Sequence, residues 1–271
     1  MADMSTYTAD ALDRIKQQAP LIHNITNFVV MNSSANILLA VGASPVMAHS
    51  PDEVEEMTAM AGALVLNIGT LQADWVEVMI LAGRAANAAG IPVILDPVGA
   101  GATRLRTDAV KRIMERCSIS VLRGNASEIL SLGSEEIKTK GVDSSLSLSE
   151  EIVPMAKAMA RTLGCIIAIS GEEDCITDGE RVFRVGNGQP LMTRVTGIGC
   201  GLSAISGAFC AVDPARPLEA VTAAFAFYGR CADLAIASSD QPGSFFVAFL
   251  DRLYATGRED LLTGLKIRSE G

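Results

Sequence analysis

Apolar residues along the chain form short continuous runs, separated by longer stretches that carry helix signals. The short runs are typical of strands buried on both faces, and they lie at 21–24, 44–47, 64–67, 92–96, 120–123 and 165–170. The longer stretches have apolar faces, capping residues or terminal glycines. They predict helices at 8–18, 27–41, 74–89, 107–116, 125–132 and 150–163, with another helix starting at Ser50. This alternation predicts an α/β fold, a mostly parallel sheet with helices on both faces.

The pattern changes after residue 170. Residues 175–183 predict a hairpin that turns at Asp178 and Gly179, and the remaining chain predicts helices at 202–212, 217–238 and 243–255. Residues 133–148 are polar and rich in Ser and Lys, so we expect them at the surface. No low-complexity linker or internal repeat divides the chain, which predicts one domain over residues 1–271.

Composition narrows the classes of function. The 271 residues are 49% hydrophobic and 4% aromatic with a net charge of −9, which argues against a general nucleic-acid-binding surface. No apolar run reaches the ~20 residues of a membrane span, and residues 1–18 are too polar for a signal peptide. The six cysteines include no Cys-x-x-Cys pair and only two histidines are present. We therefore expect no zinc site, and a reducing, cytoplasmic location.

Each of the six predicted strands ends in a polar or glycine-bearing segment. The carboxyl ends of parallel strands meet at one edge of a sheet, which is where open α/β sheets bind their ligands. Six such endings on one edge therefore indicate a binding site. The segments lie at 24–27, 47, 67–69, 96–99, 123–125 and 170–171.

A glycine-rich stretch at 196–201, Thr-Gly-Ile-Gly-Cys-Gly, precedes the buried helix expected from residue 202. A helix start offers unpaired N–H groups and the positive end of the helix dipole. Gly197, Gly199 and Cys200 are therefore candidates for an anion hole that holds a phosphoryl group. The same dipole would favour the thiolate of Cys200, which makes this residue a candidate catalytic base.

Other interpretations of this stretch remain open at this point. Residues 199–204 also fit the dinucleotide-binding pattern Gly-x-Gly-x-x-Ala. That pattern normally follows the first strand and has an acidic residue about 20 positions later, whereas here it lies late in the chain and an apolar helix follows. A tight turn that only packs the helix is the second alternative. The sequence contains no Walker-type phosphate loop.

Two carboxylates stand at neighbouring strand ends. Asp96 precedes a glycine-rich loop, and Glu128 lies one helical turn after Asn125. Such a pair suits Mg²⁺, which takes one or two protein carboxylates together with waters and phosphate oxygens. Arg123 directly precedes this element and is a candidate phosphate contact. The alternatives are that Asn125 and Glu128 only cap a helix and that Arg123 forms a surface ion pair.

Taken together, these segments resemble the hydroxyethylthiazole kinase family, in order and spacing, from about residue 20 to residue 244. Motifs this long and this numerous are specific. The matching motifs are His-Asn-Ile-Thr-Asn at 23–27, Gly-Ala-Ser-Pro-Val-Met at 42–47, Leu-Asn-Ile-Gly-Thr at 66–70, Leu-Asp-Pro-Val-Gly-Ala-Gly-Ala at 95–102, Arg-Gly-Asn-Ala-Ser-Glu at 123–128, Ile-Ser-Gly-Glu at 169–172 and Val-Thr-Gly-Ile-Gly-Cys at 195–200.

The resemblance implies a ribokinase-like fold and a phosphoryl-transfer reaction. The γ-phosphoryl group of ATP would move to the primary hydroxyl of 4-methyl-5-(2-hydroxyethyl)thiazole, in thiamine biosynthesis and salvage. It also implies Mg²⁺ as the cofactor and a homotrimer whose substrate site lies between subunits. The matching positions assign thiazole contacts to Asn27, Met47 and Gly197, ATP contacts to Arg123 and Ser170, and metal and phosphate contacts to Asp96 and Glu128.

Two positions depart from the related patterns. Ser170 stands where the family motif has Thr, although the hydroxyl is kept. Cys200 stands where the wider superfamily has Asp, which matches the thiazole kinase branch and leaves the identity of the base open. This cysteine argues against a related kinase for a hydroxymethylpyrimidine or pyridoxal-like alcohol. The complete set of Asp96, Asn125 and Glu128 argues against an inactive thiazole or nucleotide sensor.

Overall fold

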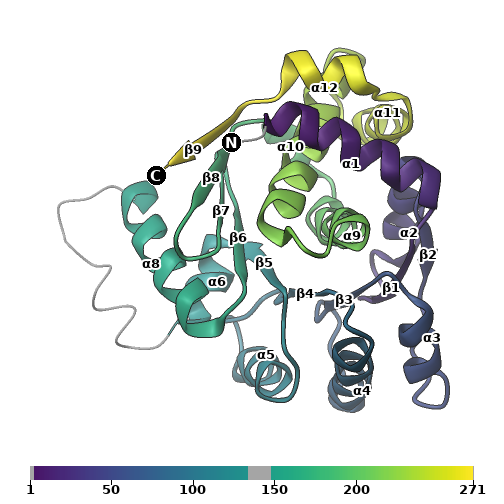
Figure 1. The fold of residues 1–271 in the computed structure, drawn as a ribbon, viewed down its shortest axis with the longest axis vertical. Coiled ribbons are helices and arrows are strands. Elements are labelled where there is room, and N and C mark those ends of the chain that lie inside the picture. Colours follow the sequence, from purple (N-terminus) through teal and green to yellow (C-terminus); the bar gives the residue numbers. More distant parts are fainter. Residues whose placement is uncertain (1–2, 134–147, 271) are drawn as a thin grey trace.

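The computed structural model describes residues 3–133 and 148–270. Within these residues the strands form one nine-stranded sheet in the order β2-β1-β3-β4-β5-β6-β7-β8-β9 (Figure 1). The first six pair in parallel: β1 Leu21–Ile25, β2 Ser44–Val46, β3 Ala63–Asn67, β4 Val93–Asp96, β5 Val121–Asn125 and β6 Ile166–Ser170. The last three pair antiparallel: β7 Asp174–Thr177, β8 Val182–Val185 and β9 Ile267–Glu270.

The predicted sheet is confirmed in its main features. All six predicted parallel strands are present, and β7 and β8 form the predicted hairpin, with Gly179 at a positive φ of 98° in the turn. Strand β9 was not predicted, because its sequence Ile-Arg-Ser-Glu has no apolar run and its burial is only partial. The polar stretch expected at the surface, residues 133–148, lies outside the described residues except for its two ends.

Helices cover both faces of the sheet, as predicted, and each face has its own hydrophobic cluster (Figure 1). One face packs against α1 Met4–Gln18, α2 Met31–Val41, α9 Ile198–Val212, α10 Pro217–Ala235 and α11 Pro242–Ala255. The other packs against α3 Val54–Met60, α4 Ala73–Ala89, α5 Arg104–Arg116, α6 Ala126–Leu132 and α8 Leu148–Leu163. Short α12 Arg258–Gly264 packs on α1, and a 3₁₀ turn, Pro190–Arg194, precedes α9.

Helix α9 begins four residues earlier than the sequence suggests. Its first residue is Ile198 instead of Leu202, so Gly199 and Cys200 belong to its first turn. The glycines serve close packing there: a Cβ on Gly201 would lie 2.5 Å from Ile37 Cδ1 and 2.6 Å from the Tyr228 hydroxyl. The helix is buried almost throughout and packs against β1, β3 and β4.

Helix α2 begins four residues later than the predicted start at Asn27. The Asn27 side-chain Oδ1 accepts a hydrogen bond from Val29 N at 3.2 Å, and Val30 N donates to the Asn27 carbonyl at the same distance. An asparagine that satisfies nearby backbone in this way competes with the helix. Asn27 therefore sits in a turn after β1, with its amide free to contact other strands' ends.

The strand order places a topological switch at β1. The chain passes from β1 to β2 on one side and later returns to β3 on the other side. A crevice at the carboxyl ends of strands beside such a switch is the usual ligand site of open parallel sheets. Among the described residues, no helix combines the length and apolarity that crossing a membrane would require.

Candidate active site

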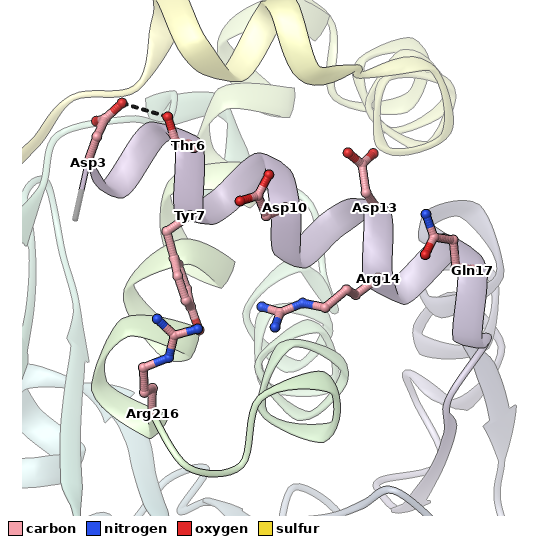
Figure 2. Close-up of a pocket in the computed structure, with 8 residues that line it drawn as sticks. All are labelled: Asp3, Thr6, Tyr7, Asp10, Asp13, Arg14, Gln17 and Arg216. Carbon is pink, nitrogen blue, oxygen red and sulfur yellow. Dashed lines mark hydrogen bonds between the residues drawn. The ribbon is translucent and has the colours of Figure 1, made fainter.

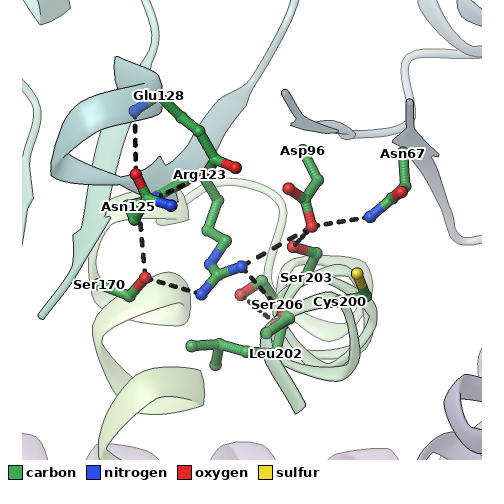
Figure 3. Close-up of polar contacts among 12 residues, drawn as sticks. Asn67, Asp96, Arg123, Asn125, Glu128, Ser170, Cys200, Leu202, Ser203 and Ser206 are labelled. Carbon is green, nitrogen blue, oxygen red and sulfur yellow. Dashed lines mark hydrogen bonds and ion pairs between the residues drawn. The ribbon is translucent and has the colours of Figure 1, made fainter. Parts of the chain in front are cut away.

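Asp96, the last residue of β4, lies at the centre of a buried polar cluster at the carboxyl edge of the sheet (Figure 3). Its Oδ2 accepts hydrogen bonds from Asn67 Nδ2 at 2.9 Å and from Ser203 Oγ at 2.7 Å. Arg123 NH1 lies 3.7 Å from the same oxygen. We call Asn67, Asp96, Arg123 and Ser203 the Asp96 cluster. It joins β3, β4, β5 and α9.

Burial makes the charge of Asp96 costly. The loss of water around this carboxyl raises its pKa to about 6, although the Arg123 guanidinium and the two hydrogen bonds oppose the rise. Glu128 is near enough to push the pKa of Asp96 further up. A buried carboxylate beside a second one favours the binding of a divalent cation, because the cation would relieve both effects.

Glu128 forms the helix cap that was one of its two predicted roles. Its Oε2 accepts a hydrogen bond from Asn125 N, and Asn125 Oδ1 accepts one from Glu128 N, each at 2.9 Å. Its Oε1 accepts from Gly99 N, in the loop after β4, at 2.8 Å. A carboxylate has about four lone-pair directions, so both oxygens retain capacity for another ligand. The cap therefore fixes Glu128 beside Asp96 and leaves its carboxylate oxygens able to accept a further ligand.

Arg123 and Ser170, the two predicted ATP contacts, touch each other. Arg123 NH2 donates to Ser170 Oγ at 2.8 Å, and Arg123 NH1 donates to the Gly199 carbonyl at 2.9 Å. Arg123 is buried, which rules out the surface ion pair considered above. Its Nε has no hydrogen-bond partner among the described residues. The guanidinium thus links β6, the first turn of α9 and Asp96.

The predicted anion hole lies at the start of α9. Gly197 caps the helix at φ 87°, and Gly201 N donates back to its carbonyl at 2.8 Å. Any Cβ at position 197 would lie 2.9 Å from Ser33 Oγ, so this conformation requires glycine. The N–H groups of Ile198, Gly199 and Cys200 have no acceptor within the helix. Gly197, Gly199 and Cys200 therefore lie together at a positive helix end.

The expectation that Cys200 is a thiolate is wrong, because the pKa of its thiol is raised and not lowered. Burial raises the pKa of the Cys200 thiol to about 11, and the nearby Asp96 carboxylate adds to the rise. These effects outweigh the hydrogen bonds to the thiol, among them one from Asn27 Nδ2 at 3.6 Å. The sequence indicated the helix end, but neither the burial of the thiol nor the neighbouring carboxylate. Cys200 is a neutral thiol near pH 7.

The three predicted thiazole contacts lie in two separate parts of the site. Asn27 is buried, and its Nδ2 donates to Asn67 Oδ1 at 2.8 Å, so it continues the Asp96 cluster toward β1. Gly197 lies close to the turn that follows Asn27, since a Cβ at position 197 would lie 3.2 Å from Val30 Cγ1. Met47 follows the edge strand β2, is half buried and lies outside the hydrogen-bonded cluster. An alcohol with an apolar ring would therefore have its polar and apolar ends recognised by different strands.

The sequence did not identify three residues of the site. Asn67 stands in one of the predicted strand-end segments, but nothing marked it as a partner of Asp96. Ser203 lies one turn after Cys200 on α9, and only the buried face of that helix could have indicated it. Arg106 donates to the carbonyls of Val98 at 2.7 Å and Gly69 at 2.7 Å, and so ties together the loops after β3 and β4.

The donor set fits Mg²⁺ and not a closed protein-only metal site. No group of three or more His, Cys, Asp or Glu side chains converges among residues 3–133 and 148–270. Asp96 and Glu128 supply two carboxylates, and Mg²⁺ commonly takes one or two of these and completes its shell with water and phosphate oxygens. These two residues would therefore hold the ion together with a nucleotide.

Comparison with known proteins identifies the family of this chain. The model of the hydroxyethylthiazole kinase family matches residues 12–259. A hydroxyethylthiazole kinase of Desulfotalea psychrophila is 53% identical over 268 residues, which cover 99% of this chain and 97% of that one. A hydroxyethylthiazole kinase structure from Pyrococcus horikoshii has 43% identity and a TM-score of 0.90, covering 98% of this chain and 99% of that one.

A more distant structure supports the fold alone. A ribokinase-like superfamily protein of Enterococcus faecalis is 14% identical with a TM-score of 0.64, over 92% of this chain and 95% of that one. The predicted ribokinase-like fold is thereby confirmed. Because the family model and a relative at 53% identity each extend over most of the chain, this protein belongs to the hydroxyethylthiazole kinase family.

Proposed function

We propose that the Asp96 cluster, Glu128 and the first turn of α9 carry out the reaction of this family. In that reaction the γ-phosphoryl group of ATP is transferred to the primary hydroxyl of 4-methyl-5-(2-hydroxyethyl)thiazole, a step of thiamine biosynthesis and salvage. The carrying observation is that two carboxylates and a helix N-terminus converge at one sheet edge. Phosphoryl transfer depends chiefly on positioning and charge neutralisation, which this arrangement supplies.

Asp96 and Glu128 would hold Mg²⁺, which neutralises phosphate charge when it is bound. Asp96 is suited to this because two hydrogen bonds and the ion pair with Arg123 keep it oriented while its surroundings leave its negative charge undercompensated. Glu128 is fixed by the two backbone N–H groups that it accepts from. Neither side chain needs to reorganise when the ion arrives, which favours catalysis.

The first turn of α9 would hold the transferring phosphoryl group. The N–H groups of residues 198–200 point out of a helix end that carries positive partial charge. Fixed donors directed at developing charge are usually the largest single contribution to catalysis. Gly197 keeps this end open because any side chain there would meet Ser33.

Cys200 would contact the acceptor hydroxyl as a neutral thiol. With a pKa of about 11, only about one thiol in 10⁴ is ionised at pH 7. The transition state of phosphoryl transfer is usually loose, so the alcohol needs little deprotonation before the bond to phosphorus forms. Cys200 then helps to orient the alcohol, together with Asn27, whose amide lies against its sulfur.

Arg123 and Ser170 would contact the nucleotide phosphates. The buried guanidinium has one nitrogen, Nε, without a partner among the described residues, and its hydrogen bonds go to a hydroxyl and a carbonyl that phosphate oxygens can replace, while NH1 also lies 3.7 Å from Asp96. Met47 would pack against the thiazole ring from the edge of the sheet. The two ligands therefore approach from opposite sides of Asp96.

The assay that tests this function measures ADP release from Mg-ATP with the thiazole alcohol, pyridoxal and the hydroxymethylpyrimidine alcohol in parallel. We expect turnover with the thiazole alcohol and at least tenfold lower kcat/KM with the others. Turnover of the thiazole alcohol in excess EDTA would contradict the metal role. Preference for pyridoxal or the pyrimidine would contradict the substrate assignment.

Ligand titrations test the separate ATP and thiazole sides. Arg123→Ala should mainly weaken ATP binding, because it removes a guanidinium that phosphate oxygens can bind. Met47→Asp should mainly weaken thiazole binding, because a charge there must lose water against an apolar ring. Equal losses of both ligands in both variants would contradict the division.

We also propose a cytoplasmic homotrimer with its active site between subunits. Phe28 and Val29, which directly follow Asn27, are 57% and 64% exposed, an apolar pair that a neighbouring subunit would cover. All six cysteines are free thiols, in keeping with a reducing compartment. Sedimentation equilibrium should give three times the 28.4 kDa chain mass. A fully active monomer would contradict both the trimer and the shared site.

A further inference from the structure

Two hydrogen bonds and an ion pair, from three elements, converge on one oxygen of Asp96. Asn67 Nδ2 and Ser203 Oγ donate to Oδ2 at 2.9 and 2.7 Å, and Arg123 NH1 lies 3.7 Å from it (Figure 3). Within the described residues, no hydrogen bond reaches the other oxygen, Oδ1. One oxygen is thus used to fix the carboxylate, and the other remains available for a ligand.

The orientation of the Asn67 amide is determined by its partners. Its Oδ1 accepts from Gly69 N at 2.9 Å and from Asn27 Nδ2 at 2.8 Å, while its Nδ2 donates to the carboxylate of Asp96. A reversed amide would place N–H groups against a backbone donor and an oxygen against a carboxylate. Asn67 is therefore a fixed bridge between Asp96 and Asn27.

Within the part of the chain that the structure describes, the Ser203 hydroxyl makes one hydrogen bond, and it goes to Asp96. Its side chain is fully buried on α9, and its hydroxyl crosses to the end of β4. Ser206 provides the contrast one turn later on the same helix. It is equally buried, but its hydroxyl donates to the Leu202 carbonyl of its own helix at 2.8 Å. Both serines are shown in Figure 3.

We propose that Ser203 and Asn67 are positioning residues for the metal-binding carboxylate. They hold Asp96 through Oδ2 so that Oδ1 stays available to the metal-nucleotide, and Asn67 also couples this carboxylate to Asn27 on the alcohol side. The proposal rests on the proposed role of Asp96 in metal binding. Groups that orient a metal ligand typically contribute about 10–100-fold to metal affinity.

The test measures binding of AMP-PCP, a non-hydrolysable ATP analogue, by calorimetry without metal and in saturating Mg²⁺. The ratio of the two dissociation constants gives the affinity gained through the metal, independently of turnover. In Ser203→Ala this gain should fall by about 10–100-fold, with metal-free affinity unchanged. In Ser206→Ala, the matched control, the gain should equal that of the wild type. A purely structural loss would lower both affinities together.

Asp96→Asn separates the inference from the proposal beneath it. If Asp96→Asn keeps the full gain, Asp96 does not hold the metal and the proposed function is wrong at this point. If Asp96→Asn loses the gain while Ser203→Ala keeps it, the metal role stands and positioning by Ser203 is overturned.

Asn67→Ala tests the bridge and repeats the test should Ser203→Ala not fold. It should lose the metal-linked gain and also bind the thiazole alcohol more weakly, because Asn27 loses its partner. Ser203→Ala should lose only the metal-linked gain and should bind the thiazole alcohol as the wild type does. Wild-type binding of the alcohol by Asn67→Ala would overturn the coupling to Asn27, and a wild-type metal-linked gain in that variant would overturn positioning by Asn67.

Discussion

Helix α9 has a buried aspartate in contact with arginine at each end, and the two ends differ in how the charge is balanced. Asp96 faces its N-terminal end, and Asp213 follows its last residue, Val212. In both carboxylates the described donors meet at Oδ2. The fifteen residues between them separate the two ends by about 20 Å.

The C-terminal end is balanced within the protein. Asp213 Oδ2 accepts from the Tyr7 hydroxyl at 2.8 Å, and lies 2.7 Å from Arg216 NH2 and 3.5 Å from Arg14 NH2. Arg216 also lies over the Tyr7 ring at 4.7 Å. Tyr7, Arg14 and Arg216 line a cavity of about 530 Å³ beside α1, together with Asp3, Asp10 and Asp13 (Figure 2). Two guanidinium groups thus offset the buried carboxylate.

The N-terminal end is unbalanced. Asp96 has one guanidinium, which is shared with Ser170 and the Gly199 carbonyl, and a second carboxylate nearby at Glu128. The dipole of α9 acts in the opposite direction, since its positive end faces Asp96 and its negative end faces Asp213, but burial still raises the pKa of Asp96. The contrast teaches that burial of an aspartate does not itself mark a functional site. The mark is a buried charge that a ligand must complete.

The largest expected effect follows from closing the anion hole. Gly197→Ala forces a side chain into a positive φ and toward Ser33, so it should displace the first turn of α9. Loss of such donors should lower kcat by about 10²–10³-fold. Gly243→Ala is the control, since a Cβ there meets nothing within 4 Å. Steady-state kinetics of both variants decide this, and a Gly197→Ala enzyme with wild-type kcat would place the phosphoryl group elsewhere.

Removing the charge of Asp96 should stabilise the folded protein, whereas removing the charge of Asp213 should destabilise it. The folded pKa of Asp96, about 6, exceeds the ordinary 3.8, so the folded state binds the proton more tightly than the unfolded state. Stability from this group is present at low pH and is lost as the pH rises from about 4 to 6. At pH 7.5 without metal, Asp96→Asn should therefore raise the free energy of unfolding by up to about 3 kcal/mol.

The matched change at the other end should have the opposite sign. Asp213→Asn keeps an oxygen for Tyr7 but removes the charge that pairs with Arg216 and Arg14. The free energy of unfolding should fall by about 1–2 kcal/mol. Urea unfolding of metal-free wild type and both variants, at pH 4.5 and 7.5, measures these differences. If both asparagine variants change stability in the same direction, the charge contrast between the ends is wrong.

The smallest effect concerns Cys200. As a neutral thiol that orients the alcohol, it should lose about tenfold or less in kcat when changed to Ala, below the ~10²–10⁴-fold typical of a general base. The pH dependence of kcat between 6 and 9 should be parallel in wild type and variant. A 10³-fold loss of kcat in Cys200→Ala, with kcat recovered in Cys200→Asp, would instead indicate that the residue at position 200 acts as the general base.

Sequence predicted the sheet and much of the site because both depend on local patterns. Buried apolar runs specify β1 and β3 to β6, and the residue after each run specifies what stands at the carboxyl edge. Contacts between distant segments could not be predicted from local patterns. Ser203 and Asp96, which share a hydrogen bond, are 107 positions apart in the sequence. The thiol of Cys200 was misjudged for the same reason, since its pKa depends on burial in the folded protein and on the Asp96 carboxylate of β4. The start of α9 was missed because glycine suits turns and close packing alike.

We propose that the reaction uses the unbalanced charge of Asp96, and kcat of Asp96→Asn decides whether it does. The measurement follows ADP release with the thiazole alcohol at saturating Mg-ATP, beside Asp213→Asn as the matched control. Because the asparagine keeps an oxygen for Ser203 and Asn67 and loses only the charge, we expect kcat to fall at least about 10²-fold in Asp96→Asn and to equal that of the wild type in Asp213→Asn. An Asp96→Asn enzyme within tenfold of wild type would contradict it.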